Sequence, residues 1–234
     1  MTANNSPVVG AQTLDRGIRL LWHLAERPGG ATMMEIARAL ELNRTAVHRM
    51  LETLTTHNLV HRTGDKRFHL SYGLVELASA VDSDLRGIAY PVMAELADAT
   101  GATANLMVPI SDTEVQAVLV VEPRLAAVHL AFRSGNRHQI DRGSGGIAIL
   151  AGRPPKPDDP EDVVRARSLG YAITKGHVLP GITGISVPVL TPSTMPETSL
   201  GVSLVDEAAV PDVAPRVVKA GAELSAQLFT VGPR

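Results

Sequence analysis

One short stretch of the sequence carries side chains that can read the edges of DNA bases. Arginine can donate two hydrogen bonds to guanine, asparagine can pair similarly with adenine, and a threonine methyl can contact thymine. The stretch falls at the start of a predicted helix, where a recognition helix meets bases in the major groove. Its residues are Asn43, Arg44, Thr45, His48 and Arg49.

Other polar and basic side chains suit the phosphate backbone, which sets affinity and register rather than sequence preference. Arg62, Lys66 and Arg67 gather at the tip of a predicted hairpin, where they suit phosphates or the minor groove. Thr32 and Arg38 belong to the helix that would cross the backbone. Each cation alone is more often ordinary solvated surface, so it is their ordered combination that predicts binding to double-stranded DNA.

Three predicted helices position these side chains. The first covers about Thr13–Arg27, has apolar residues at helical spacing and ends at a Pro-Gly-Gly turn. The second begins at a capping box formed by Thr32 and Glu35. The third has Asn43 as its N-cap and runs to about His57.

The third helix is amphipathic, and a hairpin follows it. At about 100° per residue, its apolar side chains fall in one arc and its basic side chains in another. Strands are predicted at 59–62 and 67–70, joined by the turn at 63–66. A short helix, a tight turn, an amphipathic helix and a hairpin make a winged helix-turn-helix. The inward arc holds Val47, Met50, Leu51 and Leu54.

After residue 71 the pattern changes. Residues 72–83 are helical in pattern and are interpreted as a linker helix, and a further helix is expected over 85–100 around Pro91. Short β-rich runs then alternate with helical patterns, which is typical of an antiparallel α+β domain. The chain therefore divides into residues 1–71, the linker helix 72–83 and a C-terminal domain 84–234. The expected strands are 103–109, 115–121, 128–133, 171–174, 184–189 and 200–205.

Composition bounds the alternatives. The 234 residues suffice for two modest domains, and 44% hydrophobic residues make a buried core feasible. Because there is no cysteine, disulfides, thiolate nucleophiles and cysteine-based zinc sites are excluded. Neither a signal peptide nor an apolar run long enough for a membrane span is found, so a cytoplasmic protein is expected. No cofactor is expected.

Several stretches resemble the IclR family of bacterial transcriptional regulators. The resemblance implies a winged helix-turn-helix, a linker helix and a C-terminal antiparallel α/β (GAF/profilin-like) effector-binding domain. It also implies homodimers or dimers of dimers on pseudo-palindromic operators, and control by a small molecule, often an organic acid or aromatic catabolite. Members repress or activate. The stretches are 14–18, 35–40, 45–51, 68–73 and 89–96.

The C-terminal resemblance is thinner, and it implies an effector site. The segment 141–151 looks like the family segment that opens a helix at the pocket, and amides at such a helix start suit a carboxylate. Several positions depart from the family pattern: Asp141 replaces a histidine, Thr174-Lys175 replaces an acidic pair, and a Pro-rich loop at 153–160 shortens the domain. The expected effector-binding residues are Ser144, Gly145, Gly146, Lys175, Gly184 and Ser203.

Other functions stay open at this point. The thinned motif fits a constitutive DNA-binding protein whose pocket is vestigial and whose C-terminal domain only oligomerises. A metal site could in principle draw on His129, His138, Asp141 and His177, although their spacing matches no strong signature. Ser144 misses the Gly-x-Ser-x-Gly pattern by one position, so the expectation is that the chain is not an enzyme.

Overall fold

The computed structural model describes residues 10–79, 83–125, 130 and 132–230. The chain forms two compact units, Met1–Ser83 and Asp84–Arg234. Each unit has its own hydrophobic core, and each is described by itself below.

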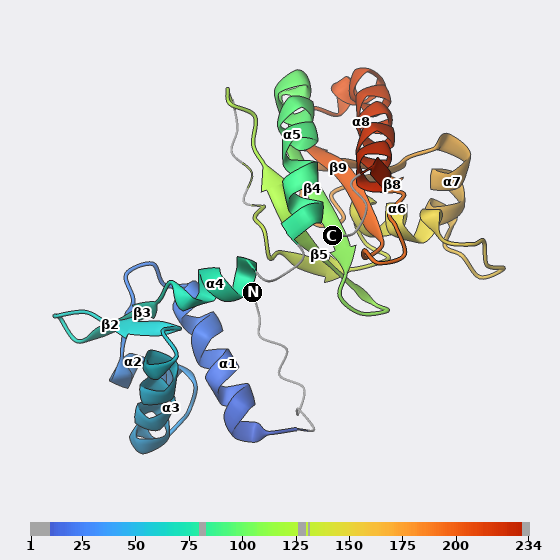
Figure 1. Ribbon diagram of the computed structural model, residues 1–234. Coiled ribbons are helices and arrows are strands. Elements are labelled where there is room, and N and C mark those ends of the chain that lie inside the picture. Colours follow the sequence, from blue (N-terminus) through green and yellow to red (C-terminus); the bar gives the residue numbers. More distant parts are fainter. Residues whose placement is uncertain (1–9, 80–82, 126–129, 131, 231–234) are drawn as a thin grey trace. The chain divides into compact units, whose positions relative to one another are not determined.

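The N-terminal unit consists of helices around a small sheet (Figure 1). The three strands are antiparallel and lie in the order β1-β3-β2. The expected helices and hairpin are present, and the structure adds the two-residue strand β1, which the sequence did not predict. The elements are α1 (Gln12–Ala25), β1 (Ala31–Thr32), α2 (Met33–Ala39), α3 (Arg44–Thr56), β2 (Val60–Arg62), β3 (Arg67–Leu70) and α4 (Gly73–Ser79).

Side-chain caps fix where α2 and α3 begin. The Thr32 hydroxyl accepts a hydrogen bond from the Glu35 amide, while the Glu35 carboxylate accepts one from the Thr32 amide, which completes a capping box. Asn43 Oδ1 accepts the Ala46 amide proton at 2.8 Å. These caps satisfy amides that have no partner inside the helix. The caps predicted from the sequence are therefore confirmed.

The core of this unit joins every element of the helix-turn-helix and the wing. The buried side of α3 packs against the other helices and the sheet, so its opposite side is left exposed. The predicted inward set is confirmed: Val47, Met50 and Leu51 are buried in this core, and Leu54, which is partly buried, packs against it. The buried residues are Leu20, Leu24, Ala31, Ile36, Val47, Met50, Leu51, Val60 and Phe68.

The predicted linker helix is partly described. Helix α4 begins at Gly73, one residue later than expected, and is described to Ser79. Gly73 lies so close to the end of α3 that a Cβ there would come within 2.5 Å of the Asn58 carbonyl oxygen. The last residues of the predicted linker, 80–82, lie outside the described residues.

The C-terminal unit has a six-stranded sheet in the order β6-β5-β4-β9-β8-β7, with every described pairing antiparallel. Together with the helical N-terminal unit, this sheet confirms the α+β class. The strands are β4 (Thr103–Pro109), β5 (Glu114–Val121), β6 (Arg137–Gln139), β7 (Ala172–Lys175), β8 (Thr183–Val189) and β9 (Thr198–Leu204). The helices are α5 (Ser83–Thr100), α6 (Ser144–Gly152), α7 (Glu161–Leu169) and α8 (Val210–Thr230), with the 3-10 turn η1 (Glu207–Ala209) before α8.

Alternation along β4 separates the two faces of this sheet. Ala104, Leu106 and Val108 belong to the core that α5 and α8 complete, whereas Met107 belongs to the cluster that includes Ile149 of α6. Figure 1 shows α5 and α8 packed side by side over the sheet, with α6 and α7 grouped together. Since successive side chains point to opposite faces, Thr103 and Asn105 share the α6 side with Met107.

Two parts of the predicted strand pattern differ from the structure. Strand β6 was not predicted, because three polar residues carry no alternation to detect. Half of the predicted strand 128–133 falls outside the described residues, and described Leu130, Phe132 and Arg133 are not in a strand. The remaining predicted strands agree with β4, β5, β7, β8 and β9 within about two residues at each end.

No helix in the described parts of the chain is long and apolar enough to cross a membrane.

We predict that replacing Asn43 with Ala lowers the free energy of unfolding by about 0.5–2 kcal/mol, because the first turn of α3 loses its side-chain cap. Urea unfolding followed by Trp fluorescence measures this, since Trp22, the chain's single Trp, lies in the same unit. Asn43→Asp is the control, because it keeps a capping oxygen. Equal losses for both variants would contradict a capping role.

Candidate nucleic-acid interface and ligand pocket

The exposed side of α3 carries most of the residues expected to read bases. Arg44, Thr45, His48 and Arg49 are all exposed, while Val47 between them is fully buried. His48 Nδ1 lies 3.2 Å from a Glu52 carboxylate oxygen one turn along. Among the described residues, Arg44 and Arg49 form neither an ion pair nor a side-chain hydrogen bond. Both guanidinium groups can therefore reach a partner without breaking an internal contact.

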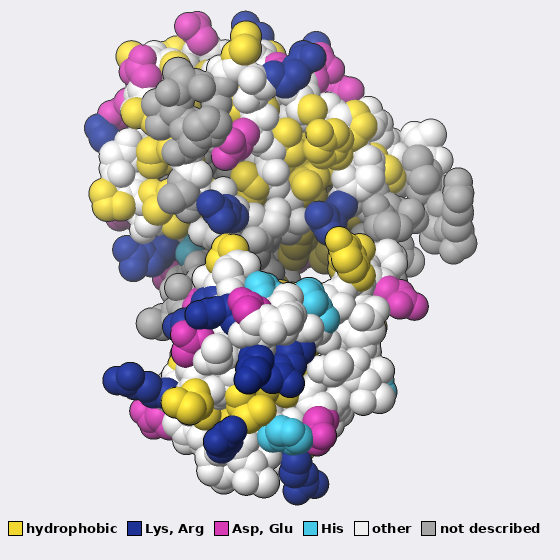
Figure 2. Space-filling model, turned by 90° about the vertical axis from the view of Figure 1, so that its left-hand side faces the viewer, with side chains coloured by type: hydrophobic (Ala, Val, Ile, Leu, Met, Phe, Trp, Pro, Cys, Tyr) yellow, Lys and Arg dark blue, Asp and Glu magenta, His cyan; other side chains and the backbone are white. Residues whose placement is uncertain are grey.

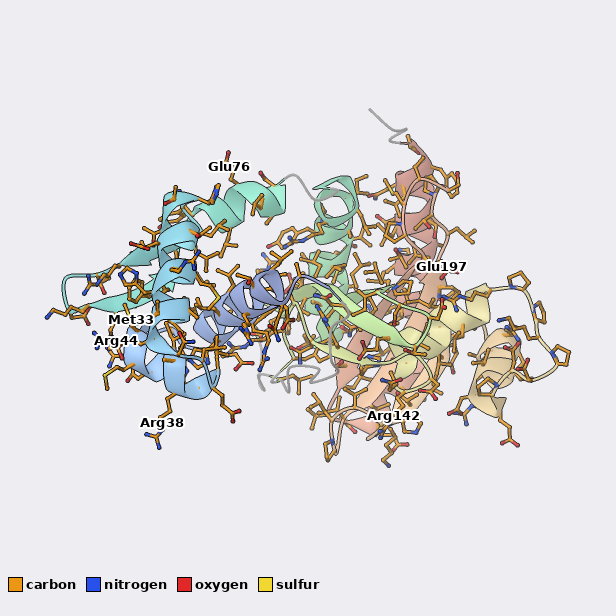
Figure 3. All side chains as sticks on the ribbon, turned by 90° about the horizontal axis from the view of Figure 1, so that it is seen from below. Met33, Arg38, Arg44, Glu76, Arg142 and Glu197 are labelled. Atoms are coloured by element: carbon orange, nitrogen blue, oxygen red, sulfur yellow. The ribbon has the colours of Figure 1, made fainter. Side chains whose placement is uncertain are left out.

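Two residues expected at the interface have their oxygens engaged in helix caps. The Asn43 amide oxygen holds the Ala46 amide, and the Thr32 hydroxyl lies 3.0 Å from a Glu35 carboxylate oxygen. Asn43 therefore lacks the free amide oxygen that a two-bond contact with adenine requires. Arg38 is exposed on α2, and Figure 3 shows its side chain projecting away from the body of the unit.

The basic side chains of the wing differ in the internal contacts that they make. Lys66 is exposed at the tip, in a left-handed backbone conformation with φ of 67°. Arg62 lies over the Phe68 ring at 5.6 Å from the centroid. Arg67 bonds the Gly30 carbonyl and a Glu35 carboxylate oxygen, both at 3.2 Å, so it ties the wing to α2. In Figure 2, several Lys and Arg side chains lie exposed on this unit among mostly uncharged surface.

A pocket of about 440 Å³, including its open mouth, lies on the α6 side of the C-terminal sheet. The lining combines apolar side chains with neutral polar groups. The lining residues are Asn105, Met107, Phe132, His138, Gly143, Ser144, Gly145, Thr174, His177, Val178, Leu179, Ile182, Gly184 and Ser203.

Helix α6 begins at the pocket. Its N-cap, Gly143, has φ of 81° and provides no side-chain cap. The first amides of a helix have no intrahelical partner and carry partial positive charge, and those of Ser144 and Gly145 lie at the pocket wall. The Ser144 hydroxyl lies 2.8 Å from that of Ser186, and the Ser199 hydroxyl donates to the Gly145 carbonyl at 2.9 Å. These bonds hold the start of α6 against the sheet.

Four of the six residues expected to bind an effector line the pocket: Ser144, Gly145, Gly184 and Ser203. Lys175 does not, because its exposed ammonium pairs with the Glu207 carboxylate instead. Gly146 does not either, because a Cβ there would lie 2.1 Å from the Ile140 carbonyl oxygen. Strand alternation explains why Lys175 lies outside the pocket, since its neighbour Thr174 faces the pocket and successive side chains of a strand face opposite ways.

Several lining residues were not predicted from the sequence. Asn105 is a buried polar residue inside the apolar strand β4, a signal that could have marked it. Its amide donates to the Ser203 hydroxyl at 3.4 Å. His138 and His177 were considered only as metal ligands. Among the described residues, no three His, Asp or Glu side chains gather to hold a metal, and His129 lies outside the described residues.

His138 is the titratable group of the pocket with a perturbed pKa. Burial lowers the pKa of His138 below 6.5, aided by the nearby Arg142 charge and opposed by hydrogen bonds to the backbone at Gln139 and Arg142. The ring nitrogen Nδ1 lies 2.9 Å from the Gln139 carbonyl oxygen. At neutral pH the pocket therefore contains a neutral imidazole.

The sequence is similar to those of known transcriptional regulators. Residues 13–64 match the IclR helix-turn-helix domain. The acetate operon repressor of Salmonella typhimurium (strain LT2) is 29% identical over 155 residues, which are 64% of this chain and 56% of that protein. The regulator BhcR of Paracoccus denitrificans (strain Pd 1222) is 27% identical, over 96% of this chain and 89% of its own length. Residues 13–64 of this chain are therefore a helix-turn-helix domain of the IclR type.

Solved IclR-type structures share the fold over nearly the whole chain. The crystal structure of an IclR homolog from Microbacterium hydrocarbonoxydans, complexed with 4-hydroxybenzoate, has a TM-score of 0.79 at 21% identity and covers 93% of this chain and 99% of that chain. The IclR regulator from Alicyclobacillus acidocaldarius has a TM-score of 0.73 at 24% identity, with the same coverage. The expected two-domain IclR fold is therefore confirmed.

We predict that Gly146→Ala destabilises the chain by about 1–3 kcal/mol, because the added methyl meets the Ile140 backbone and the helix must move. Urea unfolding followed by circular dichroism measures the change. Gly87→Ala in α5 is the matched control, because a Cβ there meets nothing within 4 Å. This control should gain up to about 1 kcal/mol from helix propensity. A neutral Gly146→Ala would contradict the packing described here.

We predict that stability falls as the pH drops below about 6.5, because the unfolded chain then protonates His138 more readily than the folded chain does. The stabilising difference is fully present above 6.5 and is lost toward the lower, folded-state pKa. Unfolding free energies at about pH 7.5 and about pH 5.5 measure it. His138→Gln should reduce the loss. The pKa of His23 in the N-terminal unit is lowered too. His23→Gln therefore measures separately how much of the stability loss at low pH comes from that unit. An unchanged loss in His138→Gln would refute this cause.

Proposed function

We propose that this chain is a sequence-specific transcriptional regulator whose binding to operator DNA is modulated by a small organic acid or aromatic molecule. The observation that carries the proposal is the exposed side of α3. It presents Arg44, Thr45 and Arg49 at the start of the recognition helix of an IclR helix-turn-helix domain. The base edges would be read there, and Lys66, Arg62 and Arg38 would contact phosphates.

In this proposal the two N-cap residues, Thr32 and Asn43, do not read bases. Thr32 and Asn43 would position α2 and α3 on the DNA, and the Asn43 side-chain amine stays available as a donor to phosphate. His48 would contact DNA once its contact with Glu52 is exchanged. Arg67, held by Glu35 and Gly30, would support the wing.

The proposed effector site is the pocket at the start of α6. The IclR homolog from Microbacterium hydrocarbonoxydans was crystallised with 4-hydroxybenzoate, and its fold matches this chain over nearly its full length. In this chain, the amides of Ser144 and Gly145 would receive a carboxylate. Ser203 and Gly184 would border the ligand. Gly146 and Lys175 are not included.

The proposed regulator acts in the cytoplasm as a homodimer or a dimer of dimers. An exposed apolar stripe on α1 supports self-association, because Leu14, Ile18 and Trp22 recur at intervals of four residues and are 64%, 46% and 49% exposed. A symmetric pair of recognition helices would then match two operator half-sites. No enzymatic activity forms part of this proposal.

The test is a titration of variants against a duplex selected from a random-sequence library by the wild-type protein. Arg44→Ala or Arg49→Ala should lower specific affinity by about 1–3 kcal/mol and relax preference at one base position. Lys66→Ala should weaken all duplexes about equally and reduce the salt slope by about one.

Arg216→Ala, which removes an exposed charge from α8 in the other unit, is the control and should change neither. If all three interface variants bind the selected duplex like the wild type, α3 and the wing are not the DNA interface. Failure to select any duplex, with folded protein, would refute sequence-specific binding itself.

A further inference from the structure

The pocket receives no charged side chain from the described residues. Its polar lining consists of hydroxyls, one carboxamide and two histidines. Lys175, the nearest candidate cation along β7, pairs outside with Glu207. Arg142 is exposed and is absent from the lining (Figure 3). The sequence at 126–131 also contains no Lys or Arg.

One hydroxyl that lines this pocket has no hydrogen-bond partner among the described residues. Thr174 is only 7% exposed and lines the pocket, yet its hydroxyl forms no hydrogen bond with any described residue. Among the described side-chain atoms, only His23 Nε2 is both shut off from solvent and without a partner, so the Thr174 hydroxyl oxygen is reachable from the pocket, where a ligand or water can accept its proton. By contrast, the neighbouring Ser144 hydroxyl is matched with that of Ser186.

The Thr174 hydroxyl and the start of α6 border the same spot. A Cβ placed on Gly184 would lie 3.5 Å from Thr174 Oγ1 and 2.5 Å from Ser144 Oγ. Gly184 therefore lets the Ser144 hydroxyl approach β8 closely, beside Thr174. Helix α6 begins at the same residue, Ser144, so its first backbone amides belong to Ser144 and the residues that follow it.

The rest of the pocket lining is largely apolar. Met107, Phe132, Val178, Leu179 and Ile182 line it, together with the neutral ring of His138. A charged group placed there would lose its hydration without gaining a counter-ion, which is strongly unfavourable. This wall therefore accepts an apolar or weakly polar ligand body and rejects a second carboxylate.

We propose that the pocket selects small ligands with a single carboxylate, bound by the amides of Ser144 and Gly145 and by the Thr174 hydroxyl, and discriminates against dicarboxylates. The proposal rests on the effector role given above and narrows it to one ligand class. Thr174 is the side chain that binds the carboxylate, because its hydroxyl has no acceptor among the described residues, while the apolar lining disfavours a second carboxylate. Gly184 allows Ser144 and Thr174 to lie side by side at this spot.

Calorimetric titration of the full chain with matched probes tests this selection. Benzoate and butyrate carry one carboxylate, terephthalate and succinate carry two, and benzamide carries none. Each monocarboxylate is expected to bind at least about tenfold more tightly than its dicarboxylate partner, and benzoate more tightly than benzamide. Dicarboxylates binding as tightly as the monocarboxylates would overturn the proposal, as would binding of none of the probes.

Variants locate the donor. Thr174→Val should weaken benzoate binding about tenfold or more, since a hydrogen bond to a charged group is lost, while Thr174→Ser should retain most of the affinity. Lys175→Gln is the neighbouring control and should leave affinity unchanged, because its ammonium faces Glu207. Melting temperatures without ligand establish that each variant is folded. Benzoate affinity that is insensitive to Thr174→Val, or reduced by Lys175→Gln, would overturn the assignment.

Anisotropy titration with the selected duplex separates this inference from the proposed function. Selective monocarboxylate binding that leaves DNA affinity unchanged would support the pocket assignment and refute the regulatory role. DNA binding without selective ligand binding would refute the pocket assignment alone.

Discussion

Burial of one side of α3 is the constraint on which the N-terminal unit depends. Val47, Met50 and Leu51 pack into the core, and a helix that buries these positions must turn Arg44, Thr45 and Arg49 toward solvent. The caps then set where the helix begins, and so which residues occupy its first turn. The wing is fixed to the same core through Phe68, while Arg67 ties it to α2. Exposed side chains of α3 and the wing are thereby held in one rigid arrangement.

The same logic operates at the pocket, where a helix is positioned by contacts at both ends. Hydroxyls of β8 and β9 hold the start of α6. At its other end, Arg167 donates to the carbonyls of Leu150 and Ala151 and pairs with Asp159 at 2.7 Å. Figure 3 labels one residue near each end of α6. Arg142 lies just before the helix, and Glu197 accepts a hydrogen bond from Arg153, which directly follows it. The pocket amides therefore sit on a firmly anchored element.

Much of the fold was predictable because the signals are local. The capping box at Thr32, the N-cap at Asn43 and the apolar arc of α3 depend only on residues a few positions apart, and each is found in the structure. Strand β1 could not be predicted, because two residues gain a strand conformation only by pairing with β3. Strand β6 is similar, since its polar residues pair with the edge of β5.

The pocket was harder to predict because it depends on which way each side chain faces. Lys175 was favoured for its charge, but alternation along β7 turns Thr174 inward and Lys175 toward Glu207. Gly146 was favoured for its place in a glycine-rich segment, whereas its close approach to Ile140 gives it a packing role. Asn105 comes from a strand distant in sequence, and only the sheet brings it to Ser203.

The central claim is that the exposed side of α3 reads DNA sequence, and binding of the unmodified protein to its own upstream region tests it most directly. Fluorescence anisotropy would compare this duplex with a scrambled duplex of the same composition at two salt concentrations. The account predicts tighter binding to the upstream duplex, with an affinity that falls as salt rises because phosphate contacts release counterions. Equal affinity for both duplexes, or binding to neither, would contradict it.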